Sequence, residues 1–426
     1  MKPNVLSKIL GLVAALLSWQ LAGIGHAQTR INETNVLVET VAGSGFAGYL
    51  DGAGTMTMFN GPSLIAVDRM TNVFVWDLGN RRIRKLSPDG TVTTFAGSGT
   101  QSRADGVGTN ASFHTPTAMI ALPDGSIVIA DLGFFRRISP AGEVTTIGGG
   151  SGYADGLLAD ARFDQDLGLT IDEQANIYVA DRGNCRIRKI STNGIVTTVA
   201  GSGNRDRVDG VGIFSSFFYP AGIARDQFGN LYVAEIGDGA TVLRRISSSG
   251  VVTTFAGRMP PYAGDGEGTN ASVRGHNVVC DSTGNIYAAG VDSIGRISPE
   301  AKITTLAGGW GQGFVDGDGQ NARFNGANFL AVDPAGRLWV ADSVNQRIRR
   351  VSYSPVPVTG LGLALYPGLS VTGALGSSFR IEFSDTLTNS PSWTPAITIT
   401  LSNSPTLWFD TSGARPKRFY RAVLVP

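Results

Sequence analysis

The chain has 426 residues, of which 42% are hydrophobic and 57 are glycine, and its formal net charge at pH 7 is +1. This length allows more than one hydrophobic core, so two domains are expected. The near-neutral charge provides no electrostatic attraction to nucleic acid or to an anionic membrane surface, and neither is expected as a partner.

The N-terminus is typical of an export signal. Lys2 and Lys8 precede an apolar run over residues 9–17, and residues 25–27 (Gly-His-Ala) provide the small residues of a cleavage site. The run is shorter than the roughly 20 residues that a membrane-spanning helix needs. We therefore predict a signal peptide over residues 1–27, a mature chain without a membrane span, and a protein that is secreted, bound to the cell surface or periplasmic.

A run similar to Val-Thr-Thr-Phe-Ala-Gly returns six times, at intervals of 51 to 56 residues. Its closing glycines are Gly43, Gly97, Gly149, Gly201, Gly257 and Gly308. Turn residues divide each unit into four short runs of β-branched and aromatic residues, for example 63–67, 72–76, 82–86 and 91–95. Four-stranded units repeating at this length are typical of propeller blades, so we predict an all-β fold with a six-bladed β-propeller over residues 37–352.

The two ends of the repeat region indicate how the ring closes. The last unit has a third strand over residues 347–351, and no fourth strand of the same type follows it. A strand of the missing type lies at the other end, over residues 38–42. The simplest closure therefore has this N-terminal strand completing the last blade.

The repeats resemble those of the NHL family, and the motifs that carry the resemblance extend over about residues 37–352. They are the Val-Thr-Thr run (196–201), Asp-Gly (209–210), Ala-Ser-Phe-His-Thr-Pro (111–116), the strand pair with its turn (226–235) and Asn-Cys-Arg-Ile-Arg-Lys (184–189). The resemblance implies a propeller, but the family includes binding propellers, ubiquitin-ligase appendages, receptor sensor domains and a peptide-amidating lyase. It therefore implies a fold more sharply than a function.

Two kinds of charged residue recur in register through the repeats. An aspartate precedes glycine in every unit, at Asp51, Asp105, Asp155, Asp209, Asp265 and Asp316. An arginine recurs in the third strand, at Arg84, Arg136, Arg188, Arg244 and Arg349. Since one site does not need six copies, we interpret both sets as scaffold, with Asp accepting hydrogen bonds from turn amides and Arg pairing with acids. The fifth unit differs, with Gly290 and Gly295 where the others have an acid and an arginine.

The loops before each Asp-Gly pair differ most between units and should emerge on one face of the ring. Aromatic residues and arginine, which are enriched in recognition hot spots, occur in them. The candidate binding residues are Phe46, Tyr49, Tyr153, Arg205, Arg207, Tyr262, Trp310 and Phe314. The alternative is that these rings fold back over the glycine-rich turns and cover the blade ends.

Arg225 is a second off-pattern residue, because the first strands of the other units end in apolar residues at this position. Its charge should either reach the central channel or extend to a carboxylate, and we favour the carboxylate.

The number of histidines argues against a peptide-amidating lyase, the enzyme included in the family that the repeats resemble. A multi-histidine zinc site, which the amidating lyase uses, needs more than His114 and His276, the two that remain after export. A lactonase-like hydrolase or lyase with a metal held by Glu, Asn and Asp in the channel stays open as the alternative, as does a purely structural protein. We favour a monomeric binding or scaffold propeller that recognises an extracellular protein, peptide or carbohydrate through one loop face, and expect no cofactor.

The remaining features concern the cysteines and the C-terminus. Cys185 and Cys280 lie in non-neighbouring units, too far apart for a disulfide, and are predicted to be free thiols.

The repeat period stops at residue 352, and a Pro-containing linker follows over residues 353–361. Short alternating runs predict a small antiparallel, β-sandwich-like module over 362–426. This module resembles a C-terminal module of secreted bacterial proteins, and attachment or spacing is its expected role.

Overall fold

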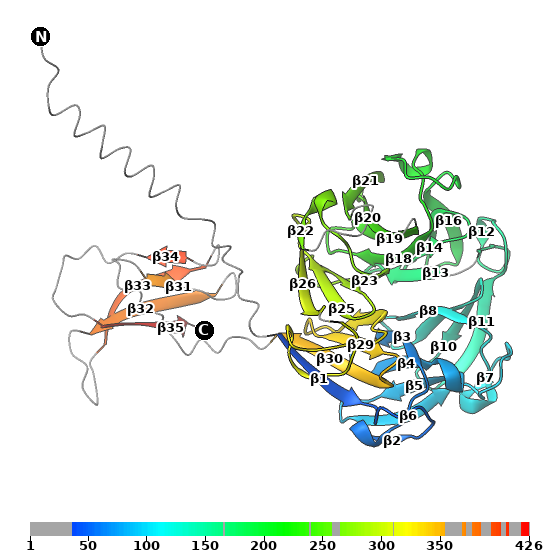
Figure 1. Cartoon of the computed structure of the whole chain (residues 1–426). Coiled ribbons are helices and arrows are strands. Elements are labelled where there is room, and N and C mark those ends of the chain that lie inside the picture. Colours follow the sequence, from blue (N-terminus) through cyan, green and yellow to red (C-terminus); the bar gives the residue numbers. More distant parts are fainter. Residues whose placement is uncertain are drawn as a thin grey trace, which may run out of the picture. The chain divides into compact units, whose positions relative to one another are not determined.

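The protein is described from a computed structural model (Figure 1). The described residues are 36–164, 167–237, 240–257, 265–309, 311–353, 369–371, 377–384, 393–401, 406–408 and 419–425. The predicted signal peptide and nearly all of the predicted linker lie outside them. The chain divides into two compact units, Met1–Tyr353 and Ser354–Pro426. Among the described residues, no helix is long and apolar enough to cross a membrane.

Unit 1 is a ring of six antiparallel sheets, or blades (Figure 1), which confirms the predicted propeller. From the inner edge outward, blade 1 contains β3 (Pro62–Val67), β4 (Val73–Asp77), β5 (Arg82–Leu86), β6 (Thr91–Ala96) and β2 (Gly52–Ala53). Blade 2 contains β8 (Pro116–Ala121), β9 (Ile127–Asp131), β10 (Phe134–Ile138), β11 (Glu143–Gly149) and β7 (Gly106–Val107). Blade 3 contains β13 (Leu167–Ile171), β14 (Ile177–Asp181), β15 (Arg186–Ile190), β16 (Ile195–Ala200) and β12 (Gly156–Leu157).

Blades 4 to 6 repeat this order. Blade 4 contains β18 (Pro220–Arg225), β19 (Leu231–Gly237), β20 (Ala240–Ile246), β21 (Val251–Ala256) and β17 (Gly210–Val211). Blade 5 contains β23 (Asn277–Cys280), β24 (Ile286–Ala289), β25 (Ser293–Ile297), β26 (Lys302–Gly308) and β22 (Gly266–Glu267). Blade 6 contains β28 (Phe329–Val332), β29 (Leu338–Asp342), β30 (Arg347–Tyr353), β1 (Val36–Ala42) and β27 (Gly317–Asp318). Short 3-10 turns follow the two-residue strand in four blades, at η1 (Gly54–Met56), η3 (Gly108–Asn110), η4 (Gly212–Phe214) and η5 (Gly268–Asn270), and a fifth, η2 (Leu78–Asn80), follows β4.

The blades differ from the predicted four-stranded form by a fifth, two-residue strand on the outer edge. In blade 1 it is β2, which pairs with β6 through Gly52↔Val92 and Ala53↔Thr91. The glycine of each Asp-Gly pair begins this strand, so the chain runs along the blade edge before it turns inward. The sequence interpretation took Asp-Gly as a turn alone and missed the pairing.

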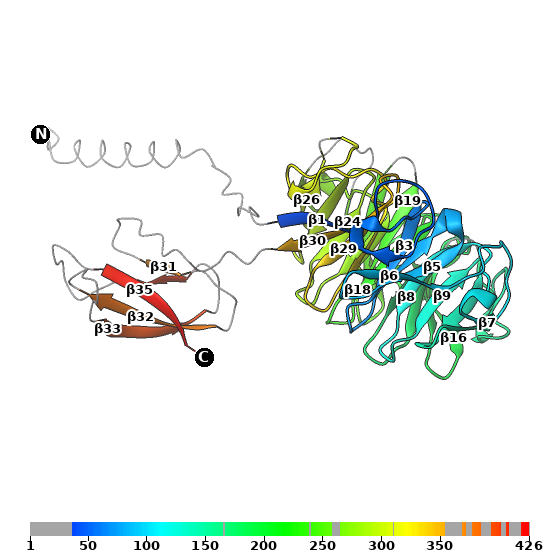
Figure 2. The same ribbon diagram turned by 90° about the horizontal axis from the view of Figure 1, so that it is seen from below.

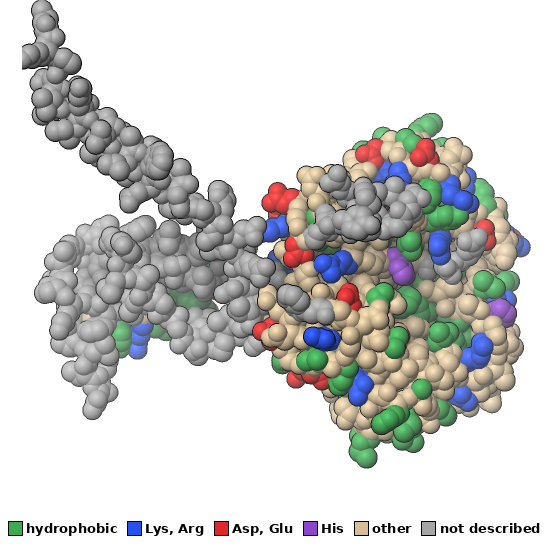
Figure 3. Space-filling view, in the orientation of Figure 1, with side chains coloured by type: hydrophobic (Ala, Val, Ile, Leu, Met, Phe, Trp, Pro, Cys, Tyr) green, Lys and Arg blue, Asp and Glu red, His purple; other side chains and the backbone are tan. Residues whose placement is uncertain are grey.

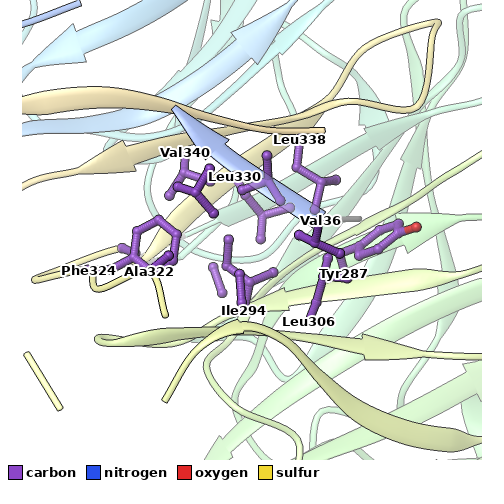
Figure 4. Packing of buried hydrophobic residues seen from close by; sticks show 14 residues of the cluster. Val36, Tyr287, Ile294, Leu306, Ala322, Phe324, Leu330, Leu338 and Val340 are labelled. Atoms are coloured by element: carbon purple, nitrogen blue, oxygen red, sulfur yellow. The ribbon is translucent and has the colours of Figure 1, made fainter. Parts of the chain in front are cut away.

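The N-terminal strand closes the ring, as predicted. β1 pairs antiparallel with β30, from Val36↔Tyr353 to Ala42↔Ile348, and the two strands lie side by side in Figure 2. Val36 packs with Leu330 and Leu338 of blade 6 and with Leu306 of blade 5 in one buried cluster (Figure 4). The first strand of the chain is therefore held both by backbone pairing and by burial of its apolar side chains.

Antiparallel pairing decides which loops share a face. The loops from the second to the third strand, and from the fourth strand to the first strand of the next blade, leave the sheets at the same end, which we call the upper face (Figure 3). The turns from the first to the second and from the third to the fourth strand lie at the other end, the lower face. The first strands of all six blades surround the central channel.

Unit 2 contains two small antiparallel sheets. One pairs β31 (Leu369–Val371) with β34 (Thr406–Trp408), and the other has the order β33 (Thr394–Thr400), β32 (Ser378–Ser384), β35 (Phe419–Val425). Phe379, Ile381 and Leu401 form a buried cluster in this unit. The alternating pattern of the sequence thus forms strands, as predicted.

Candidate binding face and central channel

A buried arginine in the third strand anchors the upper-face loop of its own blade. Arg188 on β15 is fully buried and pairs through Nη1 with Asp181 at 2.8 Å and through Nη2 with Asp155 at 2.5 Å. It also donates to the carbonyl oxygens of Ala154 and Arg162, at 2.6 and 3.1 Å. The same two-acid arrangement recurs at Arg84, Arg136, Arg244 and Arg349. These contacts give the charged residues of the repeats the scaffold role that we inferred.

The acids at the ends of the second strands are correspondingly inaccessible. Burial raises the pKa of Asp181, against the opposing effects of its hydrogen bonds and of the Arg188 charge. The same holds for Glu235 in blade 4, whose carboxylate accepts hydrogen bonds from Arg244 and Arg207, both at 3.0 Å. Each of these carboxylates is occupied by structural contacts.

Three of the predicted binding residues lie against their own blades. The hydroxyl groups of Tyr49 and Thr94 form a hydrogen bond with 2.7 Å between the oxygens, and the Tyr49 ring centroid lies 4.5 Å from the Arg82 guanidinium. Tyr153 of blade 3 and Phe314 of blade 6 occupy the same place, with Arg186 and Arg347 at 4.0 and 3.8 Å. The rings are 41–47% exposed, so they cover the blade ends while keeping one face open to solvent.

This ring-on-arginine contact is itself repeated, with its partners exchanged in blade 2. There the loop supplies the cation, Arg103, and the third strand supplies the ring, Phe134, at 4.0 Å. The contact was not visible in the sequence because the two residues are about 30 positions apart and swap identity between blades. It supports the alternative interpretation for these rings, that they cover the blade ends.

The other predicted binding residues have different surroundings. Phe46 is 72% exposed on its loop. Arg207 pairs with Glu235 and lies 4.7 Å from the Phe218 ring, whereas the exposed Arg205 lies 4.3 Å from the Tyr219 ring. Tyr262 and Trp310 lie outside the described residues. The structure thus distributes the described members of the set around the upper face and does not gather them at one point.

The central channel has a volume of about 570 Å³ and a mainly aliphatic wall. The residues around this volume include no Asp or Glu, and its polar side chains include His276 and Asn277. Aspartates line an adjoining cavity at the lower mouth, and each accepts hydrogen bonds from amides of its own turn: Asp68, Asp172, Asp281 and Asp333. The Asn277 side-chain oxygen already accepts a hydrogen bond from the Leu330 amide at 2.9 Å. Among the described residues, no group of three His, Cys, Asp or Glu is placed to hold a metal ion. This donor set does not fit the Glu, Asn and Asp metal site of the lactonase-like alternative.

Arg225 ends β18 at the lower end of the channel. Its guanidinium donates to Glu173 at 2.7 Å, across to the neighbouring blade. This hydrogen bond lowers the pKa of the Glu173 carboxyl. Arg225 therefore both lines the channel and reaches a carboxylate, the two possibilities that the sequence left open.

An apolar rim at the upper end of the channel was not predicted from the sequence. The loops after the second strands carry Leu78 (53% exposed), Leu132 (39%), Val291 (45%) and Val344 (60%), and in blade 4 the half-buried Ile236. Leu78 and Ile236 line the channel directly. We call these five residues the apolar rim. A partial signal was present, since the turn position directly after the second-strand end usually prefers Gly, Asn or Ser and is apolar in four blades. Blade 3 has Arg182 and blade 6 has Ser343 at this position, with Val344 one residue later.

The cysteines are free thiols, as predicted. Cys280 lines the channel, and burial, reinforced by the charges of Asp281 and Asp226, raises its pKa to about 12. At pH 8 only about 1 in 10⁴ of these thiols is then ionised, so we expect Cys280 to alkylate far more slowly than an unperturbed thiol. Iodoacetamide labelling of the folded chain, followed by peptide mass spectrometry, measures this. Labelling of Cys280 at the rate of a model peptide thiol would contradict it.

Comparison with known proteins supports the fold. The NHL repeat family model matches residues 324–351. The Arabidopsis thaliana protein SUPPRESSOR OF QUENCHING 1, chloroplastic, is 27% identical over 49% of this chain and 22% of its own length. Teneurin-1 of Gallus gallus is 28% identical over 39% of this chain and 7% of its own length. A solved Bacteroides thetaiotaomicron protein of unknown function superposes with a TM-score of 0.56 at 19% identity, covering 74% of this chain and 76% of that one.

These similarities confirm the resemblance to NHL-repeat β-propellers. The chain spans less than a quarter of the length of these two curated relatives, and what the whole proteins do is not transferred by such alignments. The solved structure, at its level of identity, shows the fold alone.

Proposed function

We propose that this protein is a secreted or surface-associated binding propeller whose upper face takes an extracellular partner at the mouth of the channel. The single observation that carries the proposal is the apolar rim. Four of its aliphatic side chains lie in upper-face loops after the second strands and are 39–60% exposed, and Leu78 and Ile236 line the channel. Apolar groups gathered on one face and bordered by polar loops are typical of interaction sites.

The channel behind the rim supports binding over catalysis. Its wall is aliphatic over most of its length, and the aspartates at its lower mouth already accept hydrogen bonds from the amides of their own turns. The metal-dependent hydrolase alternative therefore gains no supporting observation from these residues. An aliphatic rim also favours a protein or peptide partner over a carbohydrate, because sugar rings are usually held by aromatic faces and polar groups. The export signal supports a location outside the cytoplasm.

The double variant Leu78→Asp/Val344→Asp tests the proposal. We expect it to weaken partner binding at least tenfold, because each carboxylate would have to be desolvated in the interface. Binding of the full chain to a random peptide library and to a glycan array provides the measurement.

The matched control is Met70→Asp/Phe228→Asp, which makes the same charge change at two side chains that are 75% and 70% exposed on lower-face turns. It should bind as the wild type does. Equal losses in the two double variants, or no binding by the wild-type chain to any probe, would disprove recognition through the upper face.

A further inference from the structure

We propose that the blade 4 side of the channel mouth is a carboxylate-recognition subsite, in which Arg205, oriented by the ring of Tyr219, pairs with an acidic group of a partner polypeptide. The inference rests on the proposed function, since it names the chemistry that the upper face would select. Three observations carry it: a backbone conformation, a stacked guanidinium and the apolar rim beside them.

Tyr219 occupies a turn position whose backbone conformation favours glycine. Its φ is +50°, in the left-handed region. In blades 1, 5 and 6 the position at the same turn before the first strand is glycine, Gly61, Gly275 and Gly326, with φ of +64°, +80° and +81°. A tyrosine here carries backbone strain that glycine would avoid. We attribute its presence to a role for the side chain.

The Tyr219 ring forms a platform for arginine. The Arg205 guanidinium lies 4.3 Å and that of Arg182 5.4 Å from its centroid, and Phe218 meets the ring edge-on at 5.2 Å. The Tyr219 carbonyl accepts a hydrogen bond from the amide of Ile236, a rim residue, at 3.2 Å. The platform is therefore attached directly to the apolar rim.

Arg205 is the unusual residue of its set. Four loops form the same parallel bridge to a buried phenylalanine, and the bridging residues are Ala47, Gln101, Ser151 and Arg205. Only the loop of blade 4 places a charge there. A guanidinium stacked on a ring keeps its N–H edge available for a planar anion, and it is held without a competing carboxylate.

The acids near Arg205 are engaged elsewhere. Glu235 pairs with Arg207 and Arg244, Asp209 pairs with Arg244, and Asp206 accepts from the Arg207 amide. Within the part of the chain that the structure describes, no carboxylate pairs with Arg205. This exposed cation beside aliphatic side chains complements a peptide segment that presents an acidic group next to an aliphatic residue, with the carboxylate on Arg205 and the aliphatic group on the rim.

The experiment is selection of random 12-residue peptides on the full chain, followed by Kd measurement for the strongest peptide against single variants. We expect the selected peptides to share an Asp, Glu or free C-terminus beside Leu, Ile, Val or Phe. Arg205→Gln and Tyr219→Gly should each raise Kd tenfold or more. Arg69→Gln, which removes an exposed charge from the lower face, is the matched control and should leave Kd unchanged.

Tyr219→Gly separates binding from folding. Because glycine suits the backbone here, this variant should keep or raise the Tm while it loses affinity; a lower Tm would contradict the strain argument. If the selected peptides carry no acidic group, or Arg205→Gln binds them like Arg69→Gln while Leu78→Asp/Val344→Asp does not, the inference is wrong and the proposed function stands. If no peptide is enriched at all, both are wrong.

Discussion

Replacing Arg188 with methionine is expected to lower the free energy of unfolding by about 3–5 kcal/mol, the usual cost of removing one partner from a buried ion pair. Asp181 is fully buried, and without Arg188 its charge would lack its main compensation. The carbonyl oxygens of Ala154 and Arg162 would also each lose one donor, so the loop before β12 would lose one of the contacts that attach it to blade 3.

Urea unfolding followed by tryptophan fluorescence measures this effect. The matched control is Arg137→Met, because Arg137 pairs with Asp124 on the surface, where both side chains are about half exposed. That variant should lose less than about 1 kcal/mol. Adding Asp181→Asn to Arg188→Met should restore part of the loss, since the buried charge disappears while an acceptor remains. An Arg188→Met variant as stable as Arg137→Met would show that the buried pairs do not anchor the loops.

Gly222→Ala is expected to destabilise the propeller by about 3 kcal/mol, at the upper end of what overpacking costs. Gly222 lies on the channel strand β18, and a Cβ added there would lie 2.0 Å from the His276 carbonyl oxygen of blade 5. The three nearest atoms are all backbone atoms of His276 and Val278, so no flexible side chain can move aside. The first strands of blades 4 and 5 would have to separate, which would also widen the channel mouth.

The matched control for this substitution is Gly295→Ala in β25. Its added Cβ would have no neighbour closer than 3.9 Å, and its φ lies outside the left-handed region. That variant should be neutral or slightly stabilising, because alanine restricts the unfolded chain more than glycine does. Thermal unfolding of the two variants side by side measures the difference. A Gly222→Ala protein with the wild-type Tm would mean that the inner strands pack less tightly than these distances imply.

Blade 5 shows how the scaffold tolerates the loss of the buried arginine. Gly295 replaces the arginine of the other blades, and Gly290 replaces the acid at the end of the second strand. Asp265 still accepts a hydrogen bond from Thr305 at 2.7 Å, as its counterparts do from threonine in other blades. Each blade keeps its own strand pairing, so replacement of one arginine is a local loss.

The candidate site was harder to predict than the fold, and particular residues show why. Tyr49, Tyr153 and Phe314 are conspicuous in the sequence, yet each stacks on an arginine of its own blade. Leu78 and Val344 are inconspicuous there and become a rim only when the ring closes. The partner of Arg225 is Glu173, 52 residues earlier and one blade away. Binding through the predicted loop residues stays a prediction.

The amino-acid sequence by itself determined four of the five strands of each blade, the number of blades and the strand that closes the ring. These depend on alternation, turn residues and a constant repeat length, which act between residues close in the chain. Only the tertiary structure decided which side chains meet at the channel mouth. Closing the ring brings together loops about 50 residues apart, and side chains there meet neighbours from another blade, such as Arg182 of blade 3 beside the Tyr219 ring of blade 4.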